Sequence, residues 1–142
     1  MPDADLVVDT HVWLWSVLED AQRLTGAASR RLRRATTAAV PAIAQWEAAL
    51  LVAGGRLALD RPARDWISAA AALEPFSIAP LNPEIAVVAA DLQREGFHGD
   101  PADRMIYATA RVLDAPLLTA DRRIHAFDRA LPRSHGRRVI WD

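Results

Sequence analysis

Short apolar runs alternate with helix-like patterns along this chain, and this alternation limits the fold more than any other feature. Runs typical of strands lie at 6–8, 38–40, 76–78, 117–119 and 138–141. Helical patterns separate them at 11–19, 25–34, 42–53, 62–73, 82–94, 100–113 and 121–128. Because strands that alternate with helices pair in parallel, the sequence predicts an α/β fold with a central parallel sheet and helices on both faces.

The helix boundaries carry recognisable signals. Asn82 and Asp100 each precede a proline, which is typical of an N-cap followed by the first helical residue. Thr10 is the expected N-cap of the first helix, and Gly54 stops the helix that begins near residue 42. Of the tryptophans, Trp13, Trp46 and Trp66 lie in helical patterns and are most simply interpreted as core residues.

Length and composition indicate one domain and exclude several chemistries. The chain has 142 residues, which suits a single domain over 1–142. All 17 basic residues are arginines, so lysine-based Schiff-base and P-loop chemistry is excluded, and the absence of cysteine excludes a thiolate metal site. No secretory signal and no apolar stretch of about 20 residues is visible, so we expect a cytoplasmic protein without a membrane segment.

Acidic residues fall at the ends of the predicted strands. Asp9 ends the first strand, and Asp121 follows the fourth by two residues. Glu47 lies near the start of the helix after the second strand, and Asp103 lies in the first turn of the helix that opens at Asp100. Ligands of parallel α/β sheets bind beyond the carboxyl ends of the strands, so we expect these acids to gather there.

Gathered carboxylates repel one another unless a cation is present. A hard divalent ion such as Mg²⁺ takes oxygen ligands and keeps several waters, and two such ions can clamp an in-line displacement at phosphorus. The acids therefore point to metal-dependent phosphodiester hydrolysis. Each acid also has a local alternative. Asp9 could be a loop acid or could cap the helix that follows it, and Glu47 could have a partner or face solvent. Asp100 has the pattern of an N-cap, and Asp121 could likewise cap the helix that it precedes. Asp103 could favour the helix dipole.

Four stretches of the chain, in this order, resemble the PIN-domain family, and within it the VapC-type toxin ribonucleases of bacterial toxin–antitoxin pairs. They are VVDTHVWLW at 7–15, QWEAALL at 45–51, GDPADRMIYATA at 99–110 and LLTADRRI at 117–124. The resemblance covers nearly the whole chain. It implies a three-layer α/β/α sandwich and a Mg²⁺- or Mn²⁺-dependent endoribonuclease that leaves 3′-hydroxyl and 5′-phosphate ends.

The resemblance also assigns residues. It implies that the catalytic and metal-binding acids are Asp9, Glu47, Asp103 and Asp121. Asp9, Asp103 and Asp121 would hold one or two ions directly or through water, while Glu47 would orient a water or the second ion. Asp100 is then an additional acid that could help through water.

Other residues near these motifs have less certain roles. Thr119 matches a small hydroxyl residue often found before the last acid, and it is either a substrate-binding residue or a strand residue with a satisfied hydroxyl. Arg104 and Arg122 directly follow site acids and could meet a phosphate, as could Arg123. Pro41 and Ala44 depart from the pattern, because many relatives carry serines at these two positions.

Three further features of the sequence each allow two interpretations. The cluster SRRLRR at 29–34 could bind RNA phosphates or form a solvated helix face. His11 and His98 each lie two residues from an acid, where a mixed site would suit Mn²⁺ or Zn²⁺, although the carboxylates suffice for a hard ion. The helix at 11–19 is apolar nearly all round, which fits burial in the core or against another chain. The resemblance implies an antitoxin partner and a homodimer.

The alternative to a ribonuclease toxin is a catalytically inactive PIN-fold module that binds RNA or protein. It is disfavoured because all four acids are present. A phospho-acceptor domain or a haloacid-type phosphatase would place a lysine near the acids, and this chain has none.

Overall fold

The computed structural model describes residues 3–20, 22–132 and 138–142. Its strands are β1 (Leu6–Val8), β2 (Ala38–Pro41), β3 (Phe76–Ala79), β4 (Leu117–Leu118) and β5 (Val139–Ile140). Its helices are α1 (Thr10–Val17), α2 (Gly26–Arg34), α3 (Ile43–Ala53), α4 (Ala63–Ala72), α5 (Pro83–Leu92), α6 (Pro101–Leu113) and α7 (Arg122–Ala130). Every predicted element is therefore present, with ends that move by a few residues.

The strands form one parallel sheet in the order β3-β2-β1-β4-β5. The chain first builds outward from β1 to β3 and then crosses back to place β4 on the other side of β1. The strand order therefore reverses at β1, where Val7 pairs with Ala39 on one side and Leu117 on the other. This confirms the predicted α/β class and identifies the sheet position where parallel folds bind ligands.

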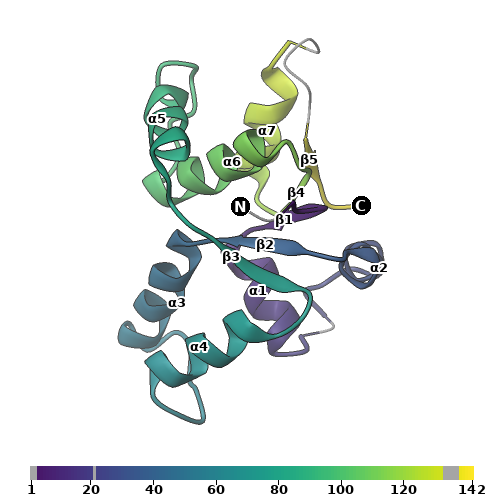
Figure 1. Cartoon of the computed structure of the whole chain (residues 1–142), viewed down its shortest axis with the longest axis vertical. Helices are drawn as coiled ribbons and strands as arrows, with labels where there is room; N and C mark the ends of the chain where they lie inside the picture. The colour runs from purple at the N-terminus through teal and green to yellow at the C-terminus, as the bar shows by residue number, and fades with distance from the viewer. Residues whose placement is uncertain (1–2, 21, 133–137) are drawn as a thin grey trace.

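Side chains of β1 alternate between two cores, one on each face of the sheet. Leu6 and Val8 point into a core with Trp13 of α1 and Trp66 of α4. Val7 points into the other core, which α5, α6 and α7 complete (Figure 1). Because every second residue faces the same side of a strand, three buried apolar residues can hold both helical layers. The architecture is the predicted α/β/α sandwich.

The tryptophan prediction is only partly right. Trp13 and Trp66 lie in the core with their rings 6.5 Å apart, as expected. Trp46, however, is 55% exposed, because it lies on the outer face of α3, where Leu50 follows one turn later and is also exposed. A mostly apolar helix pattern does not distinguish a buried face from an outer one.

A buried acid joins α7 to both neighbouring elements. Asp128 accepts hydrogen bonds from the Tyr107 hydroxyl at 2.8 Å and from the backbone N–H groups of Arg138 and Val139 at 3.2 and 3.1 Å. It thereby ties α7 to α6 and to the start of β5. In the described part of the chain, no helix is long and apolar enough to cross a membrane.

Candidate functional site

Asp9 stands at the reversal point of the sheet and is almost completely buried, with 7% of its surface exposed. One carboxylate oxygen, Oδ1, accepts the N–H of Val12 at 2.9 Å, so Asp9 is the N-cap of α1. Of the two cap candidates that the sequence offers, Asp9 and not Thr10 is therefore the cap. Thr10 is already the first helical residue, and its hydroxyl is engaged elsewhere.

The Thr10 hydroxyl donates a hydrogen bond to Oε1 of Glu47 at 2.5 Å. This contact joins the start of α1 to the first turns of α3 and holds a half-buried carboxylate beside Asp9. The sequence does not predict this role, and the only signal for it is the position of Thr10 directly after Asp9.

Thr119 connects the two acids that follow β1 and β4. Its hydroxyl donates to Oδ2 of Asp9 and accepts the N–H of Asp121 at 3.0 Å. The side chain is fully buried and so has no exposed surface to meet a substrate. Of the two roles expected for Thr119, the structure favours a satisfied hydroxyl that positions Asp9 over direct substrate contact.

Asp121 caps α7 by accepting the N–H groups of Arg123 and Ile124, both through Oδ1, at 2.8 and 3.2 Å. Asp100 caps α6 in the same way, accepting the N–H of Ala102 at 2.9 Å. The local reading of both residues is therefore confirmed. Both carboxylates also keep exposed surface, so capping leaves them accessible to a ligand.

Asp103 lies one turn into α6 and differs from the capping acids. Its pKa is raised to about 7, first because the side chain is partly buried and then because of the negative charges of Asp121, Glu47, Asp100 and Asp9. These acids come from four separate parts of the chain. The structure thus brings all of the predicted site acids within electrostatic reach of one carboxyl group.

The pKa of Asp9 is raised as well. Burial is the main cause, and the charge of Asp121 adds to it, whereas the Thr119 hydroxyl, the Val12 N–H and His11 act in the opposite direction. Within the described residues, no three Asp, Glu or His side chains are arranged as direct ligands of one ion. The acids therefore influence one another electrostatically without forming a ready set of direct metal ligands.

The two histidines near the acids have separate surroundings. His11 is exposed, with its ring 5.6 Å from that of Trp15. His98 is also exposed and lines a cavity on the other side of the acids. In the part of the chain that the structure describes, neither belongs to a group suited to bind a metal.

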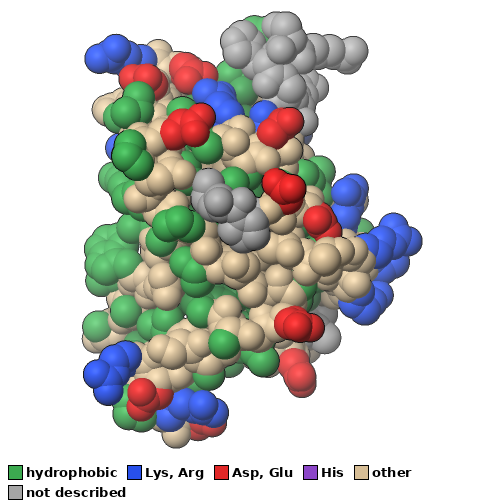
Figure 2. All heavy atoms as spheres, viewed as in Figure 1, with side chains coloured by type: hydrophobic (Ala, Val, Ile, Leu, Met, Phe, Trp, Pro, Cys, Tyr) green, Lys and Arg blue, Asp and Glu red, His purple; other side chains and the backbone are tan. Residues whose placement is uncertain are grey.

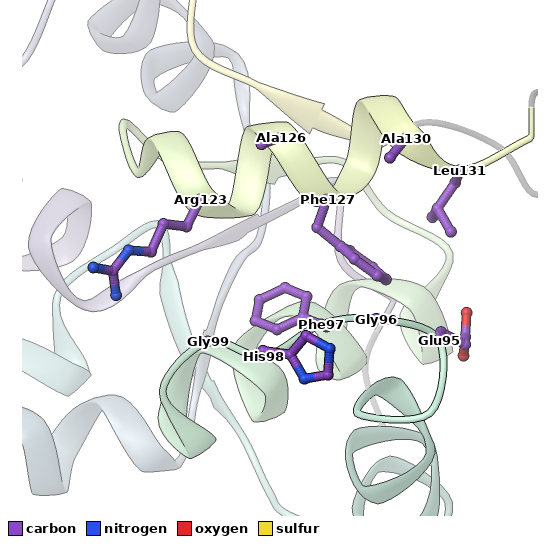
Figure 3. Close-up of a pocket in the computed structure, with 10 residues that line it drawn as sticks. All are labelled: Glu95, Gly96, Phe97, His98, Gly99, Arg123, Ala126, Phe127, Ala130 and Leu131. Atoms are coloured by element: carbon purple, nitrogen blue, oxygen red, sulfur yellow. The ribbon is translucent and has the colours of Figure 1, made fainter.

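Two hollows flank the acid cluster. One, of about 390 Å³, lies between α1 and α3 and is lined by Thr10, Glu47 and Arg56 among others. The other, of about 600 Å³, lies between the 95–99 segment and α7, with Arg123 at one end (Figure 3). Basic side chains are available here, since Arg122 and Arg123 are exposed. Arg104 is half-buried and donates to the carbonyl of Gly99 at 3.3 Å.

The arginines of α2 lie away from this site. Arg31 and Arg34 line a hollow with Asp5, Leu6 and Pro116, residues at the start of β1 and just before β4. These residues lie at the amino ends of the strands, whereas Asp9 lies at the carboxyl end of β1. Figure 2 shows basic side chains on the flank where α2 projects. The solvated-face reading of 29–34 therefore fits better than a role beside the acids.

Known proteins match this sequence and fold. Residues 6–130 match the family described as PIN domain. Ribonuclease VapC22 of Mycobacterium tuberculosis is 38% identical over 121 residues, which cover 85% of this chain and 90% of the relative.

Two solved structures share the fold. A toxin-antitoxin complex from Klebsiella pneumoniae matches with a TM-score of 0.61 at 19% identity, over 95% of each chain. VapBC2 from Rickettsia felis, bound to a DNA fragment from its promoter, matches with a TM-score of 0.59 at 12% identity, over 86% of this chain and 92% of that one. Because the family match spans most of the sequence and the identity to a VapC ribonuclease is 38%, this chain belongs to the PIN-domain family and, within it, to the VapC group.

Proposed function

We propose that this protein is a VapC-type toxin ribonuclease that hydrolyses RNA phosphodiesters at the cluster of Asp9, Glu47, Asp103 and Asp121 with the help of Mg²⁺ or Mn²⁺. The similarity to a protein named as a ribonuclease supports the reaction. The observation that carries the site is the pKa of Asp103, which is raised to about 7 by burial and by the charges of four other acids. Without a cation, the carboxylates of such a cluster repel one another.

The donor set fits a hard divalent ion. All candidate donors are carboxylate oxygens, and the chain has no cysteine to favour a softer metal. Within the described residues no three of these acids are arranged as direct ligands of one ion, so any Mg²⁺ would be held partly through the waters that this ion keeps. When bound, a divalent ion would offset the charge of the phosphate and favour ionisation of the attacking water.

The chain's own residues would divide the remaining work. Thr119 fixes the Asp9 carboxylate, and Thr10 fixes that of Glu47, so that neither acid must be ordered when RNA binds. Glu47 is half-buried and would orient the attacking water. Asp103 and Asp121 would complete the cation site from α6 and α7. Asp100 is exposed and would act, if at all, through water.

Binding of the RNA strand would use the arginines beside the cluster. Arg122 is exposed directly after Asp121, and Arg104 directly follows Asp103, which supports a role for both in contacting phosphates that flank the cut. In-line attack by water with departure of the 3′ oxygen would leave 3′-hydroxyl and 5′-phosphate ends. The 2′-hydroxyl is not needed as a nucleophile.

The protein partners are also part of this proposal. The structural neighbours are described as a toxin-antitoxin complex and as VapBC2, which supports a cognate antitoxin for this chain. We further propose a homodimer. Trp46, Leu50 and Val87 are among the exposed apolar side chains that burial in either interface would stabilise.

The test is RNA cleavage by the purified protein with Mg²⁺, with Mn²⁺ and with a chelator. We expect cleavage only with a metal ion, with 5′-phosphate ends in the products. Cleavage that persists in the chelator would contradict the metal requirement. RNA binding without any cleavage, under all metal conditions, would instead favour the inactive binding module.

A further inference from the structure

The cavity between the 95–99 segment and α7 has an apolar floor and a polar rim. Phe97 and Phe127 lie in its wall with their rings 4.7 Å apart, and both rings contact Tyr107 beneath them. Phe97 is nearly fully buried, so the half-buried Phe127 supplies the ring surface that a ligand in the cavity can reach. Leu131 extends the apolar surface (Figure 3).

The rim of this cavity carries His98 and Arg123, which are both exposed. Glu95 is the acid on the rim, and Arg111 neutralises it through contacts of 2.9 and 3.2 Å to its two oxygens. A polyanion that approaches the rim would therefore meet the exposed side chains of Arg123 and His98, while the charge of Glu95 is compensated by Arg111. Figure 3 shows the Arg123 side chain extending away from the aromatic floor.

Two chain segments connect the lining of this cavity to the acid cluster. His98 and Gly99 lead directly into Asp100, the cap of α6, and Asp103 follows within one turn. Arg123 donates its backbone N–H to Asp121, the cap of α7. A nucleic-acid strand with one phosphate at the cluster would thus have a neighbouring nucleotide at the mouth of this cavity.

We infer that this cavity binds one unstacked nucleobase of the RNA strand, next to the phosphate that is cut, with Arg123 on the adjoining phosphate. The inference rests on the proposed function. A base has an apolar face and a polar edge, which match the aromatic floor and the His98 rim. The volume of about 600 Å³ is ample for one base. A base held there has left the helical stack, so the substrate is single-stranded at that nucleotide.

The first arm of the test uses a single-stranded RNA that the wild-type protein cuts, with an abasic nucleotide placed at each position in turn. We expect one position beside the cut where loss of the base lowers kcat/KM by about tenfold. In Ala126→Trp, which adds bulk to the cavity wall, the same abasic substitution should cost nothing further. An unchanged penalty in this variant would overturn the inference.

The matched control is Ala69→Trp, which adds the same bulk at an exposed position of α4 in the other helical layer. It should keep the abasic penalty of the wild type. His98→Ala should reduce that penalty without adding bulk. If both tryptophan variants behave alike, the effect of Ala126→Trp is not specific to the cavity and the inference fails.

The second arm does not require cleavage. An oligouridine that contains 4-thiouridine is photo-crosslinked to the Asp9→Asn protein, and the labelled peptide is identified by mass spectrometry. We expect crosslinks at His98 or Phe127 that Ala126→Trp abolishes and Ala69→Trp retains. Crosslinks elsewhere would overturn the inference. If crosslinks form in the cavity but the wild-type protein never cuts RNA, the proposed function fails and the base-binding cavity stands.

Discussion

Two acidic residues of this molecule, the buried Asp128 and the partly buried Asp103, have opposite surroundings. Asp128 is 2% exposed. It accepts hydrogen bonds from the Tyr107 hydroxyl and from the backbone N–H groups of Arg138 and Val139, and these stabilise its charge. Asp103 lies among four other acids that raise its pKa to about 7. Burial alone therefore does not indicate function. An acid that folding surrounds with like charges is the one that requires a ligand.

The largest expected effect is that of Asp9→Asn on activity. This change removes a charge at the centre of the cluster, while Asn can still accept the Val12 N–H. We expect RNA cleavage to fall by at least about 100-fold, with loss of cell toxicity on induced expression. Measured cleavage rates and a growth assay test this, and wild-type rates in the variant would remove the proposed mechanism.

Asp128→Ala should have the reverse profile. It leaves the Tyr107 hydroxyl and two N–H groups without their acceptor, so we expect the free energy of unfolding to fall by about 3 kcal/mol. Cleavage per folded molecule should remain near that of the wild type. Denaturant unfolding and active-site titration separate the two quantities. A stable but inactive variant would erase the contrast between the two regions.

The pH dependence of stability should report the charges that surround Asp103. The pKa of Asp103 is about 7 in the folded protein, against an ordinary value of 3.8 for an aspartate carboxyl, so the folded state retains a proton that the unfolded chain has released. Stability of the metal-free protein should therefore fall as pH rises from about 4 to about 7. Asp103→Asn should reduce this fall and be more stable than the wild type at pH 8.

Urea unfolding at several pH values, in the presence of a chelator, measures this effect. If Asp103→Asn has the same slope of stability against pH as the wild type, the charges of the cluster do not act on Asp103 as described. A metal ion added at pH 8 should restore stability to the wild type more than to the variant.

The smallest effect concerns the two acids of α6. Asp100→Asn should keep the helix cap, because asparagine caps as well as aspartate, and we expect cleavage to fall by less than about tenfold. Asp103→Asn should cost much more. Cleavage rates of the two variants, measured side by side, decide which acid belongs to the cation site. The reverse order would assign the main role to Asp100.

Much of this arrangement follows from local sequence patterns. The alternation of strands and helices gave the fold class, and the rule for parallel sheets placed Asp9 and Asp121 at the same edge. The Asp-Pro signal identified Asp100 as a cap. These features depend on neighbours within a few residues, and the chain displays them directly. The roles of the acids in a cation site stay a prediction.

The remaining features depend on contacts between distant segments. The bond from Thr10 to Glu47 spans 37 positions, and that from Thr119 to Asp9 spans 110. No local pattern shows which of two adjacent hydroxyl or acidic residues will face the other segment. The exposure of Trp46 and the cavity beside α7 likewise depend on how helices pack, which periodicity alone does not determine.

The central claim is that folding gathers these acids to hold a divalent cation. Its most direct test is calorimetric titration of Mn²⁺ into the wild-type protein, Asp9→Asn and Asp128→Asn at pH 6.5, in buffers of different ionisation enthalpy. We predict that the wild type and Asp128→Asn bind Mn²⁺ and release protons, because Asp103 is largely protonated at that pH, and that Asp9→Asn binds far more weakly. Equal Mn²⁺ binding by all three proteins, or no binding by the wild type, would contradict the account.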